Sequence, residues 1–139
     1  MKASVKWLED LTFVGASESG HAVVMDGPPD LGGHNLGVRP MEMVLIGMGG
    51  CASIDVITIL KKSRQSVTDC VVELDAERAD SIPKVFTRIH AHFIVTGKGL
   101  VENHVKRAVD LSSEKYCSAT LMLGKTADMS HSFEIREAD

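Results

Sequence analysis

The chain has 139 residues, 44% of them hydrophobic, 24% charged and 4% aromatic, with a formal net charge of -4 at pH 7. This length and apolar content suit a core of mainly aliphatic side chains, so we expect one domain over residues 1–139. The negative net charge argues against a surface that binds the phosphates of a nucleic acid. Three cysteines are too few for a disulfide scaffold, and an odd number cannot all be paired within the chain.

The amino-terminal segment carries charges at short intervals and lacks the uninterrupted apolar core of a signal peptide. The longest uncharged apolar stretch runs from Met43 to Ile54, twelve residues between Glu42 and Asp55. A membrane-spanning helix needs roughly 18 or more apolar residues. We therefore expect a cytoplasmic protein with neither a membrane nor a nucleic acid among its partners.

Short segments of alternating polarity open the chain. Residues 3–7 alternate, and residues 11–14 and 21–25 follow with glycines and serines between them, a pattern that predicts an antiparallel sheet. Residues 26–40 hold four glycines and three prolines in fifteen positions, which cannot sustain a helix or an inner strand. We expect a long loop there, and such loops in compact domains are often functional.

A long helix is expected from about Pro40 to about Ser63. Proline is tolerated at the first helical position and Glu42 suits the positive end of the helix dipole, although Arg39 is a poor N-cap. Apolar residues surround almost the whole circumference, which indicates enclosure by a sheet or by a second subunit. A chain of 139 residues does not easily enclose such a helix alone, so we predict a homodimer.

Three glycines interrupt this helix just before a cysteine, Cys51. Gly47, Gly49 and Gly50 each cost on the order of 1 kcal/mol in a helix interior, which indicates that another backbone passes close by. At 100° per residue, Cys51 shares one stripe of the helix with three polar side chains, Asp55, Thr58 and Lys62.

Residues 67–77 alternate in polarity and place Cys70 on the core face. A turn is expected over residues 79–83, followed by a partner strand over residues 85–95, so this region predicts a hairpin. Cys70 is interpreted as a structural residue.

The last part of the chain predicts a helix, a junction, a short helix and a strand. Residues 100–112 recur with helical spacing, and Cys117 lies at the junction before a short segment, residues 119–123. Gly124 suits the end of that segment, and residues 129–135 alternate as a final strand.

Cys51 and Cys117 are the candidates for chemistry. Free N–H groups at the start of a short helix can stabilise a thiolate at Cys117. The mid-helix position of Cys51 offers no such groups, so its activation requires a cation, and Arg39 is the only arginine before it. A guanidinium can stabilise a thiolate and hold a peroxide oxygen. An inert core role remains the alternative, because buried free cysteines are usually unreactive.

The segments RPMEMVLIGMGGCASIDV and AVDLSSEKYCSATLML carry these cysteines 66 residues apart. Together they resemble the OsmC/Ohr family, specifically its YhfA-like branch, over nearly the whole chain. The resemblance implies an α+β OsmC-like fold, with antiparallel sheets wrapped around a long central helix in an intertwined homodimer. It also implies a thiol peroxidase that reduces organic hydroperoxides in oxidative stress, with active sites at the dimer interface.

The resemblance assigns roles to individual residues. Cys51 matches the peroxidatic cysteine, which becomes a sulfenic acid, and Cys117 matches the resolving cysteine, which forms a disulfide with it. Arg39 and Glu42 are the candidates for the catalytic arginine and its orienting glutamate, although Met41 stands where characterised members have that glutamate. An external dithiol is expected as reductant, with no bound cofactor and no metal.

Other readings stay open. Characterised members have their catalytic arginine in an earlier loop, whereas this chain has no arginine before Arg39, and its glutamate, Glu42, comes one position later than theirs. These differences motivate two alternatives on the same scaffold: a non-catalytic module that binds a small apolar ligand, or a purely structural dimer. Asp55 is either a proton acceptor for Cys51 or a solvated carboxylate. His90 and His92 share one face of a strand at the spacing of a metal pair, without a third ligand nearby in sequence.

Overall fold

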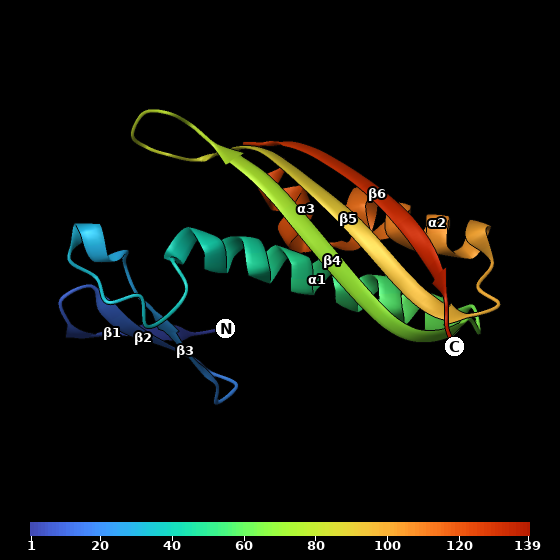
Figure 1. The fold of residues 1–139 in the computed structure, drawn as a ribbon, viewed down its shortest axis with the longest axis horizontal. Coiled ribbons are helices and arrows are strands. Elements are labelled where there is room, and N and C mark those ends of the chain that lie inside the picture. Colours follow the sequence, from blue (N-terminus) through green and yellow to red (C-terminus); the bar gives the residue numbers. More distant parts are fainter. The chain divides into compact units, whose positions relative to one another are not determined.

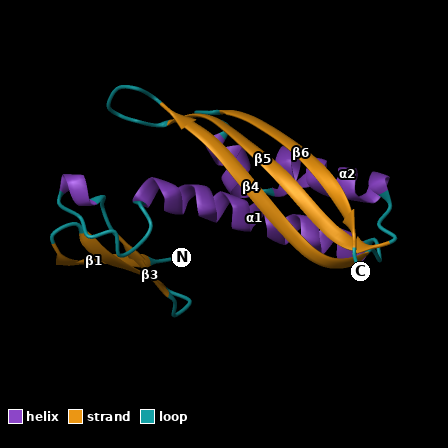
Figure 2. Ribbon diagram, in the orientation of Figure 1, coloured by secondary structure: helices purple, strands orange, loops and turns teal.

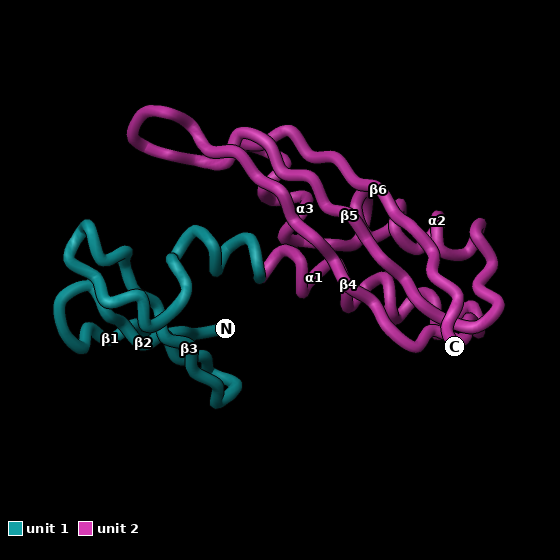
Figure 3. Tube along the Cα trace, in the orientation of Figure 1, with its two compact units in different colours: residues 1–46 teal, residues 47–139 magenta.

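A computed structural model describes residues 1–139, which form two compact units, residues 1–46 and residues 47–139 (Figure 3). The first unit holds a three-stranded antiparallel sheet in the order β1-β2-β3, so the opening sheet expected from the sequence is confirmed. Its strands are β1 (Ala3–Glu9), β2 (Thr12–Ser17) and β3 (Ala22–Met25) (Figure 1).

The loop after β3 contains one short 3-10 helix, η1 (Pro29–Leu31), and is organised by a buried carboxylate. Asp26 is only 1% exposed. One of its oxygens accepts the Thr12 hydroxyl at 3.0 Å and the backbone N–H groups of His34 and Leu36 at 3.2 Å each, and the other accepts the Gly27 N–H at 2.7 Å. The loop is therefore an ordered segment closed around one side chain.

The long helix α1 (Pro40–Lys62) begins and ends where the sequence predicts. Arg39 is its N-cap, since the Arg39 carbonyl accepts the Met43 N–H at 2.9 Å. The Arg39 side chain contributes nothing to the cap. Instead, the Glu42 carboxylate reaches back and accepts the Arg39 N–H at 2.8 Å, as in one half of a capping box.

The second unit is a two-layer structure (Figure 2), with helices against one face of a three-stranded sheet in the order β4-β5-β6. β4 and β5 form the expected antiparallel hairpin, whereas β6 runs parallel to β5 because helical segments carry the chain back before it. The elements are β4 (Ser66–Arg78), β5 (Phe86–Lys98), α2 (Glu102–Leu111), the π-helical turn η2 (Ser112–Tyr116), α3 (Ser118–Leu123) and β6 (Asp128–Glu137).

The core of this unit lies between the sheet and the helices. Its fully buried side chains come from α1, β5 and α2, and they include Val56, Leu60, Ile89, Phe93 and Val105. Several element boundaries in this unit differ from the sequence prediction by one to three residues. The β5 strand starts after Val85, which is 39% exposed, and α2 starts after Val101, which is its N-cap.

The glycines of α1 divide into two kinds. A Cβ on Gly49 would lie 2.8 Å from Leu74 Cδ1, so β4 passes close to the helix there, whereas a Cβ on Gly47 or Gly50 would meet nothing within 4 Å. Ile54, one turn beyond Gly50, is 70% exposed. The helix α1 is long and apolar enough to cross a membrane, but the core helices of soluble proteins have the same length and composition. Of its most apolar 18-residue stretch, 28% is buried in the chain.

Candidate functional site

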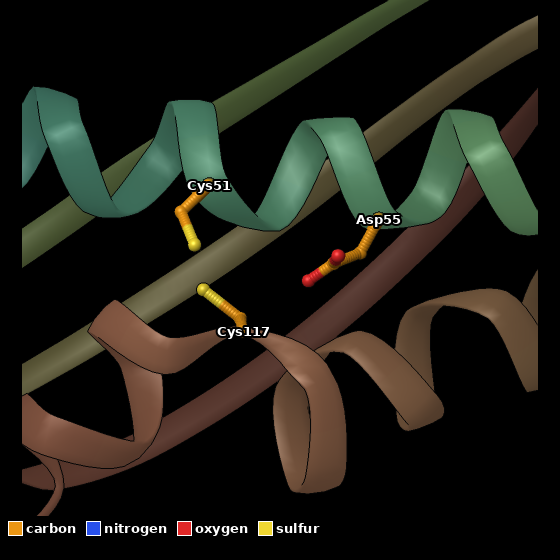
Figure 4. Close-up of side chains that lie close together, drawn as sticks. All are labelled: Cys51, Asp55 and Cys117. Atoms are coloured by element: carbon orange, nitrogen blue, oxygen red, sulfur yellow. The ribbon is translucent and has the colours of Figure 1, made fainter.

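Two segments far apart in sequence bring Cys51, Asp55 and Cys117 together (Figure 4). Cys51 and Asp55 lie one turn apart on the same face of α1, and Cys117 lies at the junction of η2 and α3. The two sulfurs and a carboxylate oxygen all lie within 4.8 Å of one another. Both thiols are free, and Cys51 is half-buried while Cys117 is 0% exposed.

Cys117 is the N-cap of α3, as its predicted place before a short helix implied. Its sulfur accepts the backbone N–H of Thr120 at 3.4 Å and the Thr120 hydroxyl at 3.0 Å, and its thiol lies 3.9 Å from the Met48 carbonyl. Burial raises the pKa of the Cys117 thiol. The Thr120 contacts oppose that rise, the neighbouring Cys51 adds to it, and the net direction is upward.

Ser112, the first residue of η2, fixes this junction against α1. Its buried hydroxyl lies 3.1 Å from the Ala52 carbonyl and 3.4 Å from Asp55 Oδ2, and its own carbonyl accepts the Cys117 N–H at 2.8 Å. One side chain therefore contacts the turns of α1 that carry Cys51 and Asp55, and one backbone group holds the second cysteine.

Sequence reasoning missed both hydroxyl residues. Thr120 had a usable signal, because a hydrogen-bonding residue three positions after an N-cap is a familiar helix-start pattern. Ser112 had none, since its partners, Ala52 and Asp55, lie about 60 residues earlier in the sequence.

Arg39 and Glu42 belong to the first unit, and their contacts lie within it. The Arg39 Nη1 group donates to Asn35 Oδ1 at 3.0 Å and to the Gly37 carbonyl at 3.2 Å. Glu42 contacts the Arg39 backbone N–H, not the guanidinium. The carboxylate thus serves the start of the helix, in agreement with its expected place at the positive end of the helix dipole.

A cavity of about 680 Å³ adjoins Asp55 in the second unit. Its wall is mixed in character: Lys62 and Arg107 supply positive charge, and Ile59 and Tyr116 supply apolar surface. Lys62 lies on the helix stripe that also holds Cys51 and Asp55, which the sequence predicted, whereas Arg107 on α2 was not singled out.

His90 and His92 do share one face of β5, but their ring nitrogens contact hydroxyl and carboxylate groups of β6. His90 lies 2.6 Å from Ser130 Oγ and 2.9 Å from Ser132 Oγ, and His92 lies 2.7 Å from Ser132 Oγ and 3.1 Å from Glu134 Oε1. This hydrogen-bonded row accounts for the histidine pair.

Cys70 lies on the inner face of β4, as predicted. It is half-buried, and burial together with the nearby Asp69 charge raises the pKa of its thiol. Cys70 does not belong to the cluster of Cys51, Asp55 and Cys117.

Comparison with known proteins identifies relatives of this chain. A family model described as OsmC-like protein matches residues 33–132. The chain is 53% identical to Protein YhfA of Escherichia coli (strain K12) over 138 residues, which cover 97% of this chain and 98% of the relative.

Solved structures share the fold. A hypothetical protein from Aquifex aeolicus VF5 superposes with a TM-score of 0.86 at 28% identity, covering 99% of this chain and 97% of that one. A Legionella pneumophila structure, described as an organic hydroperoxide resistance protein OsmC, superposes with a TM-score of 0.68 at 16% identity, covering 96% and 95%. These likenesses support the α+β architecture expected from the sequence.

Proposed function

The chain belongs to the OsmC-like protein family, and from that premise we propose that it is a thiol peroxidase that reduces organic hydroperoxides with Cys51 and Cys117. One observation carries the proposal: the two sulfurs lie within 4.8 Å of each other although 66 residues separate them in sequence. The name of the Legionella pneumophila neighbour, an organic hydroperoxide resistance protein, points to the same substrate class.

The difference in burial supports the proposed order of the two cysteines. Cys51 is half-buried, whereas Cys117 is 0% exposed, so the hydroperoxide is expected to meet Cys51 first. The Cys51 thiolate attacks one oxygen of the hydroperoxide, the O–O bond breaks, and the alcohol leaves after taking up a proton. Cys51 becomes a sulfenic acid.

Cys117 then attacks the Cys51 sulfur and expels its oxygen as water, which forms the disulfide. The Thr120 N–H and hydroxyl stabilise negative charge on Cys117 during this step. An external dithiol returns two electrons and two protons and restores both thiols. The bond requires the sulfurs to approach to about 2.05 Å, a movement of at most a few ångströms.

Three polar side chains have proposed supporting roles. Asp55 accepts the proton that the Cys51 thiol loses, with its carboxylate oriented by Ser112. Arg39 precedes Cys51 by twelve residues, about 18 Å along a helix axis, so the proposed guanidinium that holds a peroxide oxygen is that of a second copy in the homodimer; its Nε and Nη2 groups would serve, since Nη1 is engaged by Asn35 and Gly37. Glu42 is a positioning residue that fixes the Arg39 backbone.

The exposed face of α1 supports the proposal that the protein acts as a homodimer; a cytoplasmic location remains a proposal from the sequence. Gly47, Gly50 and Ile54 recur at helical spacing on that face, and both glycines border open space within the chain. Small residues at this spacing permit close helix packing against a second copy. Sedimentation equilibrium tests this, and a stable monomer at micromolar concentration would contradict it.

The central experiment exposes the reduced protein to one equivalent of an alkyl hydroperoxide and maps its cysteines by mass spectrometry. A Cys51–Cys117 disulfide is expected. Cys117→Ser should stop at a sulfenic acid on Cys51, Cys51→Ser should abolish the reaction, and Cys70→Ser is the matched control that should leave it unchanged. Recovery of two intact thiols in the unmodified protein would overturn the proposal.

A second candidate function rests on a different feature. An almost wholly apolar pocket of about 330 Å³ lies in the first unit, with Val5, Val23 and Met43 in its lining. It suits a small apolar ligand. Tight binding of such a ligand by Cys51→Ser, together with inert thiols in the unmodified protein, would favour a binding module over a peroxidase.

A further inference from the structure

Cys51, Asp55 and Cys117 form a set of donors that suits a metal ion. Two sulfurs and one carboxylate oxygen lie within 4.8 Å of one another, and Figure 4 shows all three side chains directed toward a common centre. In a tetrahedral Zn²⁺ site with bonds of about 2.3 Å to sulfur and 2.0 Å to oxygen, the donor atoms are about 3.5 to 3.8 Å apart. Rotamer adjustments of about 1 Å would therefore bring the set around one ion.

We propose that the reduced protein binds one Zn²⁺ ion per chain through Cys51 Sγ, Cys117 Sγ and an oxygen of Asp55. Because Cys51 is only half-buried, water would fill the fourth position on the ion. This inference goes beyond the proposed peroxidase function and does not rest on it.

The groups around the three donors favour this use. Metal-bound thiolates and carboxylates are usually held by an outer set of hydrogen bonds. Cys117 Sγ already accepts two, from the Thr120 N–H at 3.4 Å and the Thr120 hydroxyl at 3.0 Å, and the Ser112 hydroxyl lies 3.4 Å from Asp55 Oδ2.

The type of donor selects the type of metal. Thiolate sulfur favours Zn²⁺ over Mg²⁺ and Ca²⁺, which prefer sites made of oxygen. Asp55 adds the third ligand of an open zinc site, and α1 presents it one turn from Cys51 without any loop rearrangement.

Two other groups of possible ligands in the chain lack these features. Glu9, Asp10 and His34 are all exposed, with His34 paired to Asp10 at 2.6 Å. The second group, Asp110, Glu114 and His131, contains no thiol. Its Asp110 carboxylate already contacts Lys106 and His131. Neither group therefore offers a comparable zinc site.

Zinc binding and disulfide formation exclude each other. Binding converts two thiols to thiolates and releases two protons to solvent without any change of oxidation state. When an alkyl hydroperoxide oxidises the two sulfurs to a disulfide and is itself reduced to an alcohol, both sulfur ligands are lost and the ion leaves. The cluster would thus hold zinc only while it is reduced.

Cobalt is the first probe, because Co²⁺ substitutes for Zn²⁺ and its spectrum reports the ligands. Anaerobic titration of the reduced, chelator-treated protein should give thiolate-to-cobalt charge-transfer absorption that saturates at one ion per chain and disappears when Zn²⁺ is added. Competition against a chromophoric chelator then measures zinc affinity. Addition of alkyl hydroperoxide should then release the bound zinc, an outcome that tests the proposed peroxidase function and not zinc binding itself.

Variants identify the ligands. Cys51→Ser and Cys117→Ser should abolish the charge-transfer band, and Asp55→Asn should weaken zinc binding about tenfold or more. Cys70→Ser and Asp110→Asn are the matched controls and should bind normally. Circular dichroism shows whether each variant is folded.

Absence of the band in the reduced protein, or a band that persists in Cys51→Ser, would overturn the proposal. So would an unchanged zinc affinity in Asp55→Asn. Disulfide formation by hydroperoxide is measured on the same protein without metal, so failure of the zinc proposal and failure of the peroxidase proposal are separate results.

Discussion

The hydroxyl oxygen of Thr120 lies 3.0 Å from the sulfur of Cys117, and the backbone N–H of the same residue lies 3.4 Å from it. A fully buried cysteine thus receives two hydrogen bonds from one residue at the start of α3. Because burial disfavours its thiolate, these two contacts are the main compensation available to Cys117 within the chain.

Replacing Thr120 with valine tests this relationship. Thr120→Val removes the O–H···S contact and keeps the side-chain shape, so the pKa of Cys117 should rise further. A hydrogen bond to a charged group contributes about 1.5 kcal/mol, so formation of the disulfide from the Cys51 sulfenic acid should slow by about tenfold. Rapid-mixing mass spectrometry measures that rate. Thr120→Ser keeps the hydroxyl and should react nearly normally, and equal rates in both variants would contradict the role.

Alkaline pH should weaken the fold through Cys70 and Cys117. Burial raises the pKa of both thiols above their ordinary value of 9.0, so the unfolded chain releases these protons at lower pH than the folded chain does. The stabilising contribution is fully present below about pH 9 and is lost as pH rises through the higher folded-state values. Urea unfolding at a series of pH values measures this.

The matched variant for that measurement is Cys70→Ala combined with Cys117→Ala. Its stability should fall less steeply above pH 9 than that of the unmodified protein, although its absolute stability is lower. Parallel slopes for the two proteins would show that these thiols do not contribute.

Asp26 should make the first unit sensitive to acid. Burial opposes its ionisation, but the hydrogen bonds from Leu36, Gly27, Thr12 and His34 outweigh that effect and lower the pKa of its carboxyl. The stabilisation is therefore present above the ordinary value near 3.8 and is lost as pH falls through the lower folded-state value.

Hydrogen exchange of the loop amides that bond to Asp26 measures this effect. Asp26→Asn should increase their exchange at neutral pH and remove the acid dependence, because an amide cannot accept the same set of four hydrogen bonds. Asp30→Asn, at an exposed position of the same loop, should change neither. Protected loop amides in Asp26→Asn would refute the assignment.

The glycines of α1 should separate folding from assembly. Gly50→Ala adds a methyl group in open space and should favour the helix within one chain by about 1 kcal/mol, yet weaken the proposed dimer. Gly49→Ala should instead displace the Leu74 side chain, whose Cδ1 would lie 2.8 Å from the new Cβ. Sedimentation equilibrium and thermal unfolding distinguish the two effects, and an unchanged dimer in Gly50→Ala would show that this face is not the interface.

Local patterns were sufficient to predict most elements of the fold. The glycines and prolines of residues 26–40 marked the loop, Pro40 marked the start of α1, and Cys117 was placed before a short helix that ends at Gly124. Each of these features depends on residues that are neighbours in the sequence, so it can be predicted from the sequence without knowledge of the fold.

Features that depend on distant partners escaped prediction. Ser112 bonds to the Ala52 carbonyl, sixty positions earlier, and Asp26 closes its loop through Thr12, fourteen positions earlier. Glu42 has two possible uses in the sequence, at the start of the helix and as a partner for a guanidinium, and in the structure it accepts the Arg39 backbone N–H. The same carboxylate suits both uses, and only coordinates distinguish them.

The π-helical turn η2 makes the spacing between Ser112 and Cys117 as important as the identity of either residue. A π-helical turn takes up about one residue more than an α-helical turn, and each residue of a helix rotates the chain by about 100°. Deletion of a single residue between these two positions would turn the Cys117 sulfur away from α1 with both cysteines still present in the chain. The distance between the two sulfurs therefore depends on the number of residues between Ser112 and Cys117. A scan of single substitutions, which leaves that number unchanged, would not detect this dependence.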